Sequence, residues 1–199
     1  MSAFGRALRR IIRLYKTTKM RRVIRQFESF GKNSVIDMPM ITVHPERIAI
    51  GDDVQILKDS RLCVYLDNSK IDAHISIGDR CILNCRDTIM AGADIRIGND
   101  VIIASDCCIL SEDHGFNPES EIPYYDQILI SKETTIDDGC WLGHGVIVLA
   151  GVHIGKKCVI GGGAVVTKDI PDYSMAVGNP ARVIKRYNFT EHRWEKEGI

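Results

Sequence analysis

His114 is the residue in this sequence that is best placed for acid–base chemistry. It follows two acidic residues in the run Glu112-Asp113-His114-Gly115. Imidazole titrates near neutrality, so a histidine can take the proton of an attacking hydroxyl group at physiological pH. The carboxylate of Glu112 or Asp113 could hold the other ring nitrogen and fix its tautomer. The alternative is a surface-loop histidine that makes only a local hydrogen bond.

The element that must position this histidine is a six-residue repeat. Apolar residues recur at every sixth position, and a second set of small or apolar residues follows each of them four positions later. No helix has this period and a flat strand has period two, whereas a short strand followed by a tight bend repeats in this way. Three such units close a triangular coil of about 18 residues, and stacked coils form a parallel β-helix. The first set is Ile136, Leu142, Val148, Ile154, Ile160 and Val166, and the second is Cys140, Val146, Val152, Cys158, Ala164 and Ile170.

The same repeat extends toward the N-terminus, with interruptions. We expect it to begin near Ser34, with a loop at residues 66–73 and a slip of the frame near residues 95–97. It disappears between residues 111 and 135, where a polar and aromatic excursion contains His114. A solenoid that interrupts itself over such a length usually does so for function. Beyond the repeat, residues 184–199 are predicted to form a cap that ends in a short helix.

Length and composition fit one solenoid domain with short extensions. The chain has 199 residues, of which 45% are hydrophobic and 26% are charged. No apolar run approaches the roughly 18 residues that span a bilayer, and the basic start lacks the apolar core of a signal peptide. We therefore expect a cytoplasmic protein. Four of the seven cysteines (Cys81, Cys107, Cys140 and Cys158) fall on the small position of the repeat, and no C-x-x-C pair occurs. This pattern predicts buried, reduced thiols.

Residues 1–33 are predicted to form a basic helical arm. Residues 1–30 contain nine Lys or Arg and a single acidic residue, Glu28, whereas the rest of the chain has an acidic excess. Apolar residues at three- and four-residue spacings predict an amphipathic helix over residues 3–29. Residues 1–27 could contact an anionic membrane surface, or the apolar face could pack on the solenoid or on another subunit. The arm shows no pattern of stacking aromatic residues, so nucleic acid is not expected as a partner.

Two motifs near the C-terminus give the chain a family resemblance. One runs from Trp141 through Gly161-Gly162-Gly163-Ala164 to Pro171, and the other is Gly178-Asn179-Pro180-Ala181-Arg182-Val183-Ile184. Together with the repeat, they resemble the hexapeptide-repeat acyltransferases over roughly residues 75–187. Within this family the resemblance is to the galactoside and maltose acetyltransferases and the polysaccharide O-acetyltransferases. It implies an all-β solenoid, with a left-handed parallel β-helix at residues 34–183, that assembles as a homotrimer.

The resemblance also implies roles for individual residues in the transfer of an acetyl group from acetyl-CoA, without a metal ion. His114 matches the family's general base. The amide of His144 matches a group that faces the thioester oxygen, where an N–H stabilises the developing oxyanion. The implied acetyl-CoA contacts are Trp141, Gly162, Ala164, Thr167, Lys168, Arg182 and Lys185, with the cations meeting the phosphates. The implied acceptor contacts are Asn84, Arg86 and Asp113, although the run Asn84-Cys85-Arg86-Asp87 departs from the sugar acetyltransferase pattern.

The predicted function is therefore acetyl-CoA-dependent O-acetylation of a carbohydrate acceptor. The acceptor we expect is a sugar of a surface polysaccharide or of its precursor. Two alternatives share the fold. A zinc-dependent γ-type carbonic anhydrase needs three histidines that meet across a subunit interface, and the close histidine pair typical of that enzyme is missing here. A non-catalytic hexapeptide scaffold needs neither His114 nor a CoA site.

Overall fold

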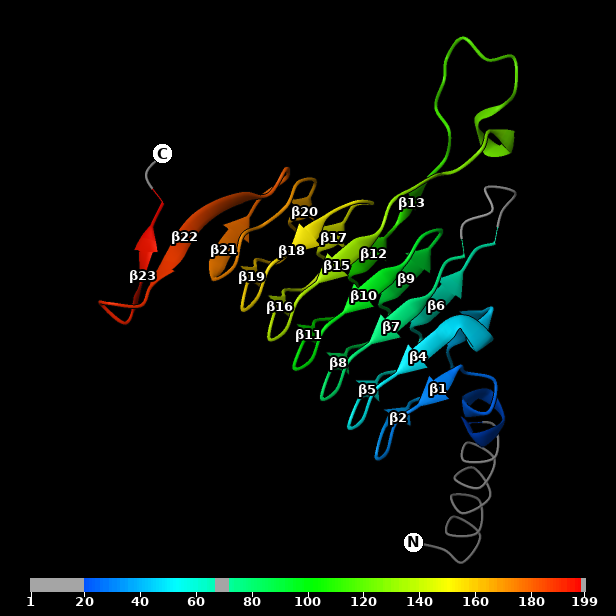
Figure 1. Cartoon of the computed structure of the whole chain (residues 1–199), viewed down its shortest axis with the longest axis horizontal. Coiled ribbons are helices and arrows are strands. Elements are labelled where there is room, and N and C mark those ends of the chain that lie inside the picture. The colour runs from blue at the N-terminus through cyan, green and yellow to red at the C-terminus, as the bar shows by residue number, and fades with distance from the viewer. Residues whose placement is uncertain (1–19, 67–71, 198–199) are drawn as a thin grey trace, which may run out of the picture.

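The computed structural model describes residues 20–66 and 72–197, which form a triangular solenoid of three sheets (Figure 1). Sheet A contains β1 (Ser29–Phe30), β4 (Ile48–Ile50), β7 (Ile75–Ile77), β10 (Ile95–Ile97), β15 (Thr134–Ile136) and β18 (His153–Ile154). Sheet B contains β2 (Val35–Ile36), β5 (Gln55–Ile56), β8 (Ile82–Leu83), β11 (Ile102–Ile103), β16 (Trp141–Leu142), β19 (Val159–Ile160), β21 (Ser174–Val177), β22 (Arg182–Asn188) and β23 (Arg193–Lys196). Sheet C contains β3 (Ile41–Val43), β6 (Arg61–Val64), β9 (Thr88–Ala91), β12 (Cys108–Leu110), β17 (Ile147–Val148) and β20 (Val165–Val166).

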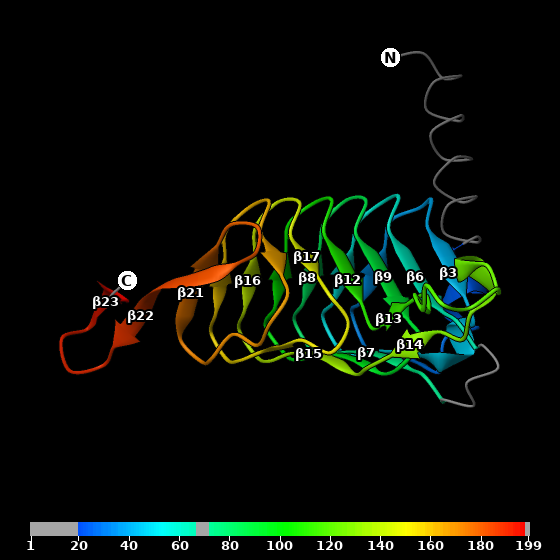
Figure 2. The ribbon, with the colours of Figure 1, turned by 90° about the horizontal axis from the view of Figure 1, so that it is seen from above.

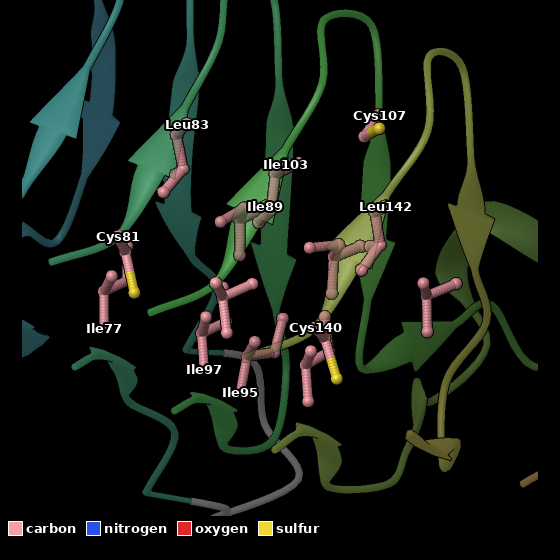
Figure 3. Packing of buried hydrophobic residues seen from close by; sticks show 14 of the residues in the cluster. Ile77, Cys81, Leu83, Ile89, Ile95, Ile97, Ile103, Cys107, Cys140 and Leu142 are labelled. Atoms are coloured by element: carbon pink, nitrogen blue, oxygen red, sulfur yellow. The ribbon is translucent and has the colours of Figure 1, made fainter. Parts of the chain in front are cut away.

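The repeat forms this solenoid because one residue of each short strand points to the axis and stacks on its counterpart in the next coil. In sheet B, Leu83, Ile103 and Leu142 are register partners of one another in successive coils, and Figure 3 shows them stacked in the interior. All three are fully buried. Burial of a Leu or Ile side chain contributes on the order of 1.5–3 kcal/mol. The predicted left-handed parallel β-helix is confirmed.

The cysteines of the repeat fill the narrow corners of the coils, as predicted. Cys81, Cys107, Cys140 and Cys158 are all buried. Burial raises the pKa of the Cys81 thiol to about 11 and that of the Cys107 thiol to about 12. Both thiols therefore stay protonated near neutral pH and behave as small hydrophobic groups.

Two of the three corners of the triangle are tight turns that contain a left-handed residue. We call the turn that joins sheets A and B the A–B corner, and name the other two corners in the same way. At the A–B corner the left-handed residues are Asn33, Asp53, Arg80, Asp100, Gly139, Lys157 and Tyr173. At the B–C corner they are Asp59, Arg86, Asp106, Gly145 and Gly163. The C–A corner has left-handed residues in two coils, His44 and Gly151, but its connections vary in length and one of them is the excursion.

The slip of the repeat frame falls at the C–A corner. Ile75 and Ile95 are register partners 20 residues apart, whereas Thr135 and His153 are partners 18 residues apart. Both Ile95 and Ile97 point inward from β10. The two extra residues of the longer coils therefore lie between sheets and leave the flat faces undisturbed.

The N-terminal boundary of the solenoid differs from the prediction. Strand β1 pairs in register with β4, so the first coil begins at Ser29, inside the segment predicted as a helical arm. Residues 20–24 are helical, and Val23 and Ile24 pack against the core. Most of the predicted arm, and the centre of the loop predicted at residues 66–73, lie outside the described residues. Within the described ranges, no helix is long and apolar enough to cross a membrane.

The predicted C-terminal helix is wrong. Strand β22 pairs antiparallel with β21, and β23 pairs antiparallel with β22, so a hairpin extends sheet B past the last coil (Figure 2). The open edge of β21 offers unpaired backbone groups in line with the sheet, and pairing with them satisfies more groups than an isolated short helix would.

Asp87 is a carboxyl group in the interior of the third coil. It is 1% exposed and occupies the small slot at the B–C corner, where its Oδ1 accepts a hydrogen bond of 3.0 Å from the Cys107 amide. Its Oδ2 is buried and has no hydrogen-bond partner among the described residues. Burial raises the pKa of Asp87 to about 8, so the folded state holds a proton that the unfolded state loses above about pH 4.

We therefore expect Asp87 to make the fold less stable as pH rises from about 4 to about 8. The unfolded chain binds fewer protons than the folded chain throughout this window. The loss by pH 7 is on the order of 4 kcal/mol. Asp87→Asn removes the titration, so in urea unfolding its stability relative to the wild type should rise between pH 5 and pH 8. An equal difference in stability at the two pH values would contradict this assignment.

Candidate active site

The excursion that contains His114 leaves the solenoid at the C–A corner. Strands β13 (Glu112–Asp113) and β14 (Ile130–Ser131) form an antiparallel ribbon at its base, and a 3₁₀ turn, η2 (Tyr124–Asp126), lies farther out. The Gln127 side chain donates to the carbonyls of Asn117 and Ile122 and accepts from the Asn117 amide. These bonds tie the two sides of the excursion together, and Figure 1 shows it projecting from the body of the solenoid.

His114 lines a cavity of about 500 Å³ at the foot of the excursion. The other walls come from the C–A edge of the first three coils and from the returning strand of the excursion. The lining residues are Val43, His44, Tyr65, Leu66, Met90, Glu112, His114 and Leu129. Burial raises the pKa of the Tyr65 phenol, so this hydroxyl stays a neutral hydrogen-bond donor. Asp113 is exposed on β13.

The His144 turn lies at a different edge of the triangle, the B–C corner. Trp141 is on the outer face of β16 and is 53% exposed. His144 is exposed in the turn that follows, and its Nδ1 lies 3.5 Å from the Asp106 carboxylate. Asp106 is held in turn by Arg86, which donates two hydrogen bonds of 2.6 Å to it. The pKa of the Asp106 carboxyl is lowered, first by this pairing with Arg86.

Backbone amides at the B–C corner are left open, unlike most of those at the A–B corner. At the A–B corner, side-chain oxygens of the next coil cap the first turn amide of five coils, as Asp79 does for Asp52 and Asn99 does for Asp79. The amides of Asp138 and Asp172 at this corner donate no hydrogen bond to a described residue. At the B–C corner, the first turn amides donate no hydrogen bond to any residue in the described part of the chain. These amides belong to Lys58, Cys85, Ser105, His144 and Gly162. The B–C corner therefore presents a row of free donors along the solenoid.

Two glycines keep part of this row bare. Gly145 and Gly163 have φ values of 67° and 70°, and a Cβ added at either position would meet nothing within 4 Å. The equivalent position in the preceding coil holds Asp106 at a φ of 67°, so the backbone there does not require glycine. The absence of side chains at Gly145 and Gly163 leaves a ledge of exposed backbone beside His144 and Gly162.

The residues assigned to acetyl-CoA divide between edges of the triangle. Thr167 and Lys168 are exposed at the C–A corner after β20, whereas Arg182 and Lys185 lie on β22 at the end of sheet B. Ala164 is fully buried, so its side chain fills the core slot and cannot contact a ligand. The position belongs to the inward set of the repeat, so the predicted acetyl-CoA contact at Ala164 could involve only its backbone.

Asn84 and Arg86 belong to the B–C corner and do not line the cavity of His114. Asn84 donates its side-chain amide to the Ile103 carbonyl at 2.8 Å, and Arg86 is engaged with Asp106. The predicted residues therefore gather at two edges of one chain, with His114 at one and His144 at the other. The residues that the sequence did not single out are Tyr65, His44 and Asp106. Asp106 precedes the excursion and His144 follows it, so a count of six-residue units alone could not place them together.

The repeat of this chain matches that of a known protein family. Residues 133–168 match the family model described as bacterial transferase hexapeptide, six repeats. The predicted resemblance to the hexapeptide-repeat acyltransferases is confirmed over these residues. Among the described residues, no group of three His, Cys, Asp or Glu side chains could hold a metal ion.

Curated relatives of the chain carry acetyltransferase names. A probable acetyltransferase of Mycobacterium tuberculosis is 39% identical over 132 residues, which cover 65% of this chain and 43% of the relative. A galactoside O-acetyltransferase of Lactococcus lactis is 34% identical over 125 residues, which cover 63% and 59%. The chain thus spans about half the length of the curated relatives it matches.

Solved structures share the fold. AntD, an N-acyltransferase from Bacillus cereus in complex with dTDP-4-amino-4,6-dideoxyglucose and coenzyme A, superposes with a TM-score of 0.74 at 20% identity, over 88% of this chain and 91% of that one. A maltose O-acetyltransferase from Clostridium difficile gives a TM-score of 0.52 at 28% identity, over 82% and 72%.

Proposed function

We propose that this protein is an O-acetyltransferase that moves an acetyl group from acetyl-CoA to a sugar hydroxyl group. The observation that carries the proposal is the bare ledge at Gly145 and Gly163, which exposes the open amides of His144 and Gly162 close to the exposed Trp141. An extended pantetheine chain can lie against such a surface, and its amide oxygens can accept hydrogen bonds from the free N–H groups. Most of the equivalent amides at the A–B corner are capped, so the open amides of the B–C corner are the ones that remain for a ligand.

A complete site needs two copies of the chain, and a homotrimer supplies them. His114 at the C–A corner and His144 at the B–C corner lie on opposite sides of sheet C, so one subunit cannot bring both to one thioester. The outward side chains also differ between sheets. Sheet A presents Ser29, Ala49, Ser76, Arg96, Thr135 and His153, whereas sheet B presents Val35, Gln55, Ile82, Ile102, Trp141, Val159 and Met175. The apolar face of sheet B is the surface we expect a neighbouring subunit to cover, at least in part.

In the mechanism we propose, His114 accepts the proton of the acceptor hydroxyl as its oxygen attacks the thioester carbonyl. The His144 amide donates a hydrogen bond to the carbonyl oxygen, which gains negative charge as the tetrahedral intermediate forms. Collapse breaks the carbon–sulfur bond, and the thiolate leaves without any covalent bond to the enzyme. His114 then donates the proton that it took from the hydroxyl group to the departing sulfur.

The acceptor we propose is a sugar of a surface polysaccharide or of its precursor. A putative lipopolysaccharide biosynthesis O-acetyl transferase of Escherichia coli is 37% identical over 108 residues, in support of this class. The cavity beside His114 combines apolar walls at Val43, Leu66 and Met90 with polar groups at His44 and Tyr65, which suits a sugar ring. The proposed location is the cytoplasm, with residues 1–27 placed against the inner membrane surface.

The proposal predicts release of free CoA that depends on a sugar acceptor. Purified full-length protein, acetyl-CoA and candidate glycosides should give thiol release, with acetylated sugar detected by mass spectrometry. Arg182→Ala should raise the Michaelis constant for acetyl-CoA by about 10-fold, since one charge-assisted contact is lost. Arg96→Ala, on the polar face of sheet A, is the matched control and should leave the constant unchanged. Absence of CoA binding in the wild type would refute the proposal.

A further inference from the structure

The outer face of sheet B continues without a break from the last coils into the C-terminal hairpin. Trp141 is the register partner of Val159, Val159 of Met175, Met175 of Lys185, and Lys185 of Lys196. Four strand spacings of about 4.8 Å separate the first residue from the last, about 19 Å in all. The row that starts at the ledge thus ends on a hairpin that lies outside the six-residue repeat.

The two faces of this hairpin differ in charge. On the face that continues the interior side of sheet B, cations and anions are paired. Arg186 donates to Glu197 at 2.6 Å, Arg193 lies 3.2 Å from Glu195, and Asn188 donates to Glu195 at 3.0 Å. On the outer face, Lys185 and Lys196 stand directly opposite each other. Neither lysine forms an ion pair with any residue in the ranges that the structure describes.

A like-charge pair directly across two antiparallel strands destabilises them unless an anion lies nearby. The positive charges of Lys185 and Lys196 on the outer face therefore lack a negatively charged partner among the described residues. The next register pair on the same face is aromatic, Tyr187 opposite Trp194, with ring centroids 5.4 Å apart at an angle of 75°. Two lysines next to a half-buried aromatic pair have the chemistry that binds a phosphorylated nucleoside, with phosphate on the ammonium groups and the base on the rings.

We propose that the outer face of the hairpin, formed by Lys185, Lys196, Tyr187 and Trp194, binds the phosphoadenosine end of CoA and reads its 3′-phosphate. This inference rests on the proposed function, because Trp141 and the hairpin lie at opposite ends of one row of register partners, and Trp141 is the end close to the ledge. It adds Lys196 and the aromatic pair to the site, none of which belongs to the repeat or to the motifs of the sequence. The hairpin then acts as a specificity element that distinguishes CoA from ligands that end at the diphosphate.

The test is calorimetric titration of the full-length protein with CoA, dephospho-CoA and 4′-phosphopantetheine. The wild type should bind CoA about 10-fold more tightly than dephospho-CoA. Lys196→Ala should weaken CoA binding by about 10-fold, abolish that preference and leave 4′-phosphopantetheine affinity unchanged. Lys196→Arg should retain the preference. The matched control is Arg193→Ala, which removes one positive charge from the same strand on the opposite face and should leave all three affinities unchanged.

Other outcomes would overturn the inference. The alternative role for Lys196 is protection of an edge strand, because a lysine there prevents edge-to-edge aggregation. In that case Lys196→Ala would aggregate more readily and bind CoA as the wild type does. Wild-type protein that transfers acetyl groups but binds CoA and dephospho-CoA equally would overturn the reading of the 3′-phosphate and leave the proposed function intact. Failure of the wild type to bind CoA at all would overturn both.

Discussion

His114→Ala should lower the turnover of acetyl transfer by about 10²–10⁴-fold, the usual contribution of a positioned general base. Without the imidazole, the hydroxyl group must attack while still protonated or lose its proton to water. The side chain lies in the wall of an open cavity and carries no part of the core, so folding and the affinity for acetyl-CoA should be preserved. Steady-state kinetics with saturating acceptor, together with calorimetry for acetyl-CoA, would measure both quantities.

His153→Ala is the control for this experiment. His153 is also exposed and pairs with a carboxylate, Asp137, at 3.1 Å, but it lies on the outer face of sheet A, away from both edges that carry the site. Its loss should leave turnover within about twofold of the wild type, as is usual for surface substitutions. Turnover that survives His114→Ala and collapses in His153→Ala would mean that the base lies on sheet A.

The six-residue pattern predicted the solenoid because each unit depends only on residues close to it in the sequence. A residue such as Leu142 is buried in any coil that closes, whatever its neighbours are. The C-terminal hairpin could not be predicted in the same way. The segment Arg182–Asn188 becomes a strand because β21 presents an open edge to it, and this edge exists only once the last coil has formed. Local spacing alone could not decide between helix and strand, because the choice depends on the free edge of β21.

The candidate site shows a second limit of the sequence. Motifs indicated a chemical role for His114 and His144, and both side chains are exposed in the structure. Their places at two edges follow from the number of six-residue units between them, and the excursion interrupts that count. The open amides were also invisible in the sequence, because they depend on which turn has an Asp or Asn in the next coil to cap it. The repeated Asx residues of the A–B corner, such as Asp52, Asp79 and Asn99, are the signal that could have shown the difference.

His144→Pro should reduce turnover by about 10²–10³-fold, the cost of removing one oxyanion donor. Proline deletes the N–H together with the imidazole, whose Nδ1 lies 3.5 Å from Asp106. The amide makes no hydrogen bond within the described chain, and the next residue, Gly145, has the left-handed φ that follows proline in a type II turn. His144→Ala keeps the amide, so it should retain most of the activity. A comparison of the two variants separates the backbone donor from the imidazole.

Ser105→Pro tests whether proline disturbs the coil. Ser105 is the first turn residue at the same corner one coil earlier, its amide is equally free, and it is followed by Asp106 in the left-handed region. If this variant has normal stability and activity, a defect in His144→Pro can be assigned to the missing donor. Equal loss in His144→Ala and His144→Pro would instead place the chemistry on the imidazole beside Asp106.

The two variants together test the division of the site between subunits. In a trimer, a subunit with His114→Ala still offers the His144 amide, and a subunit with His144→Pro still offers His114. Where the two meet in the right order, one intact site forms. Denaturing and refolding an equimolar mixture of the two nearly inactive proteins should therefore restore a substantial fraction of wild-type activity. Each variant refolded alone should stay inactive. If both residues serve one site within a single chain, every site in the mixture keeps one defect and no activity returns.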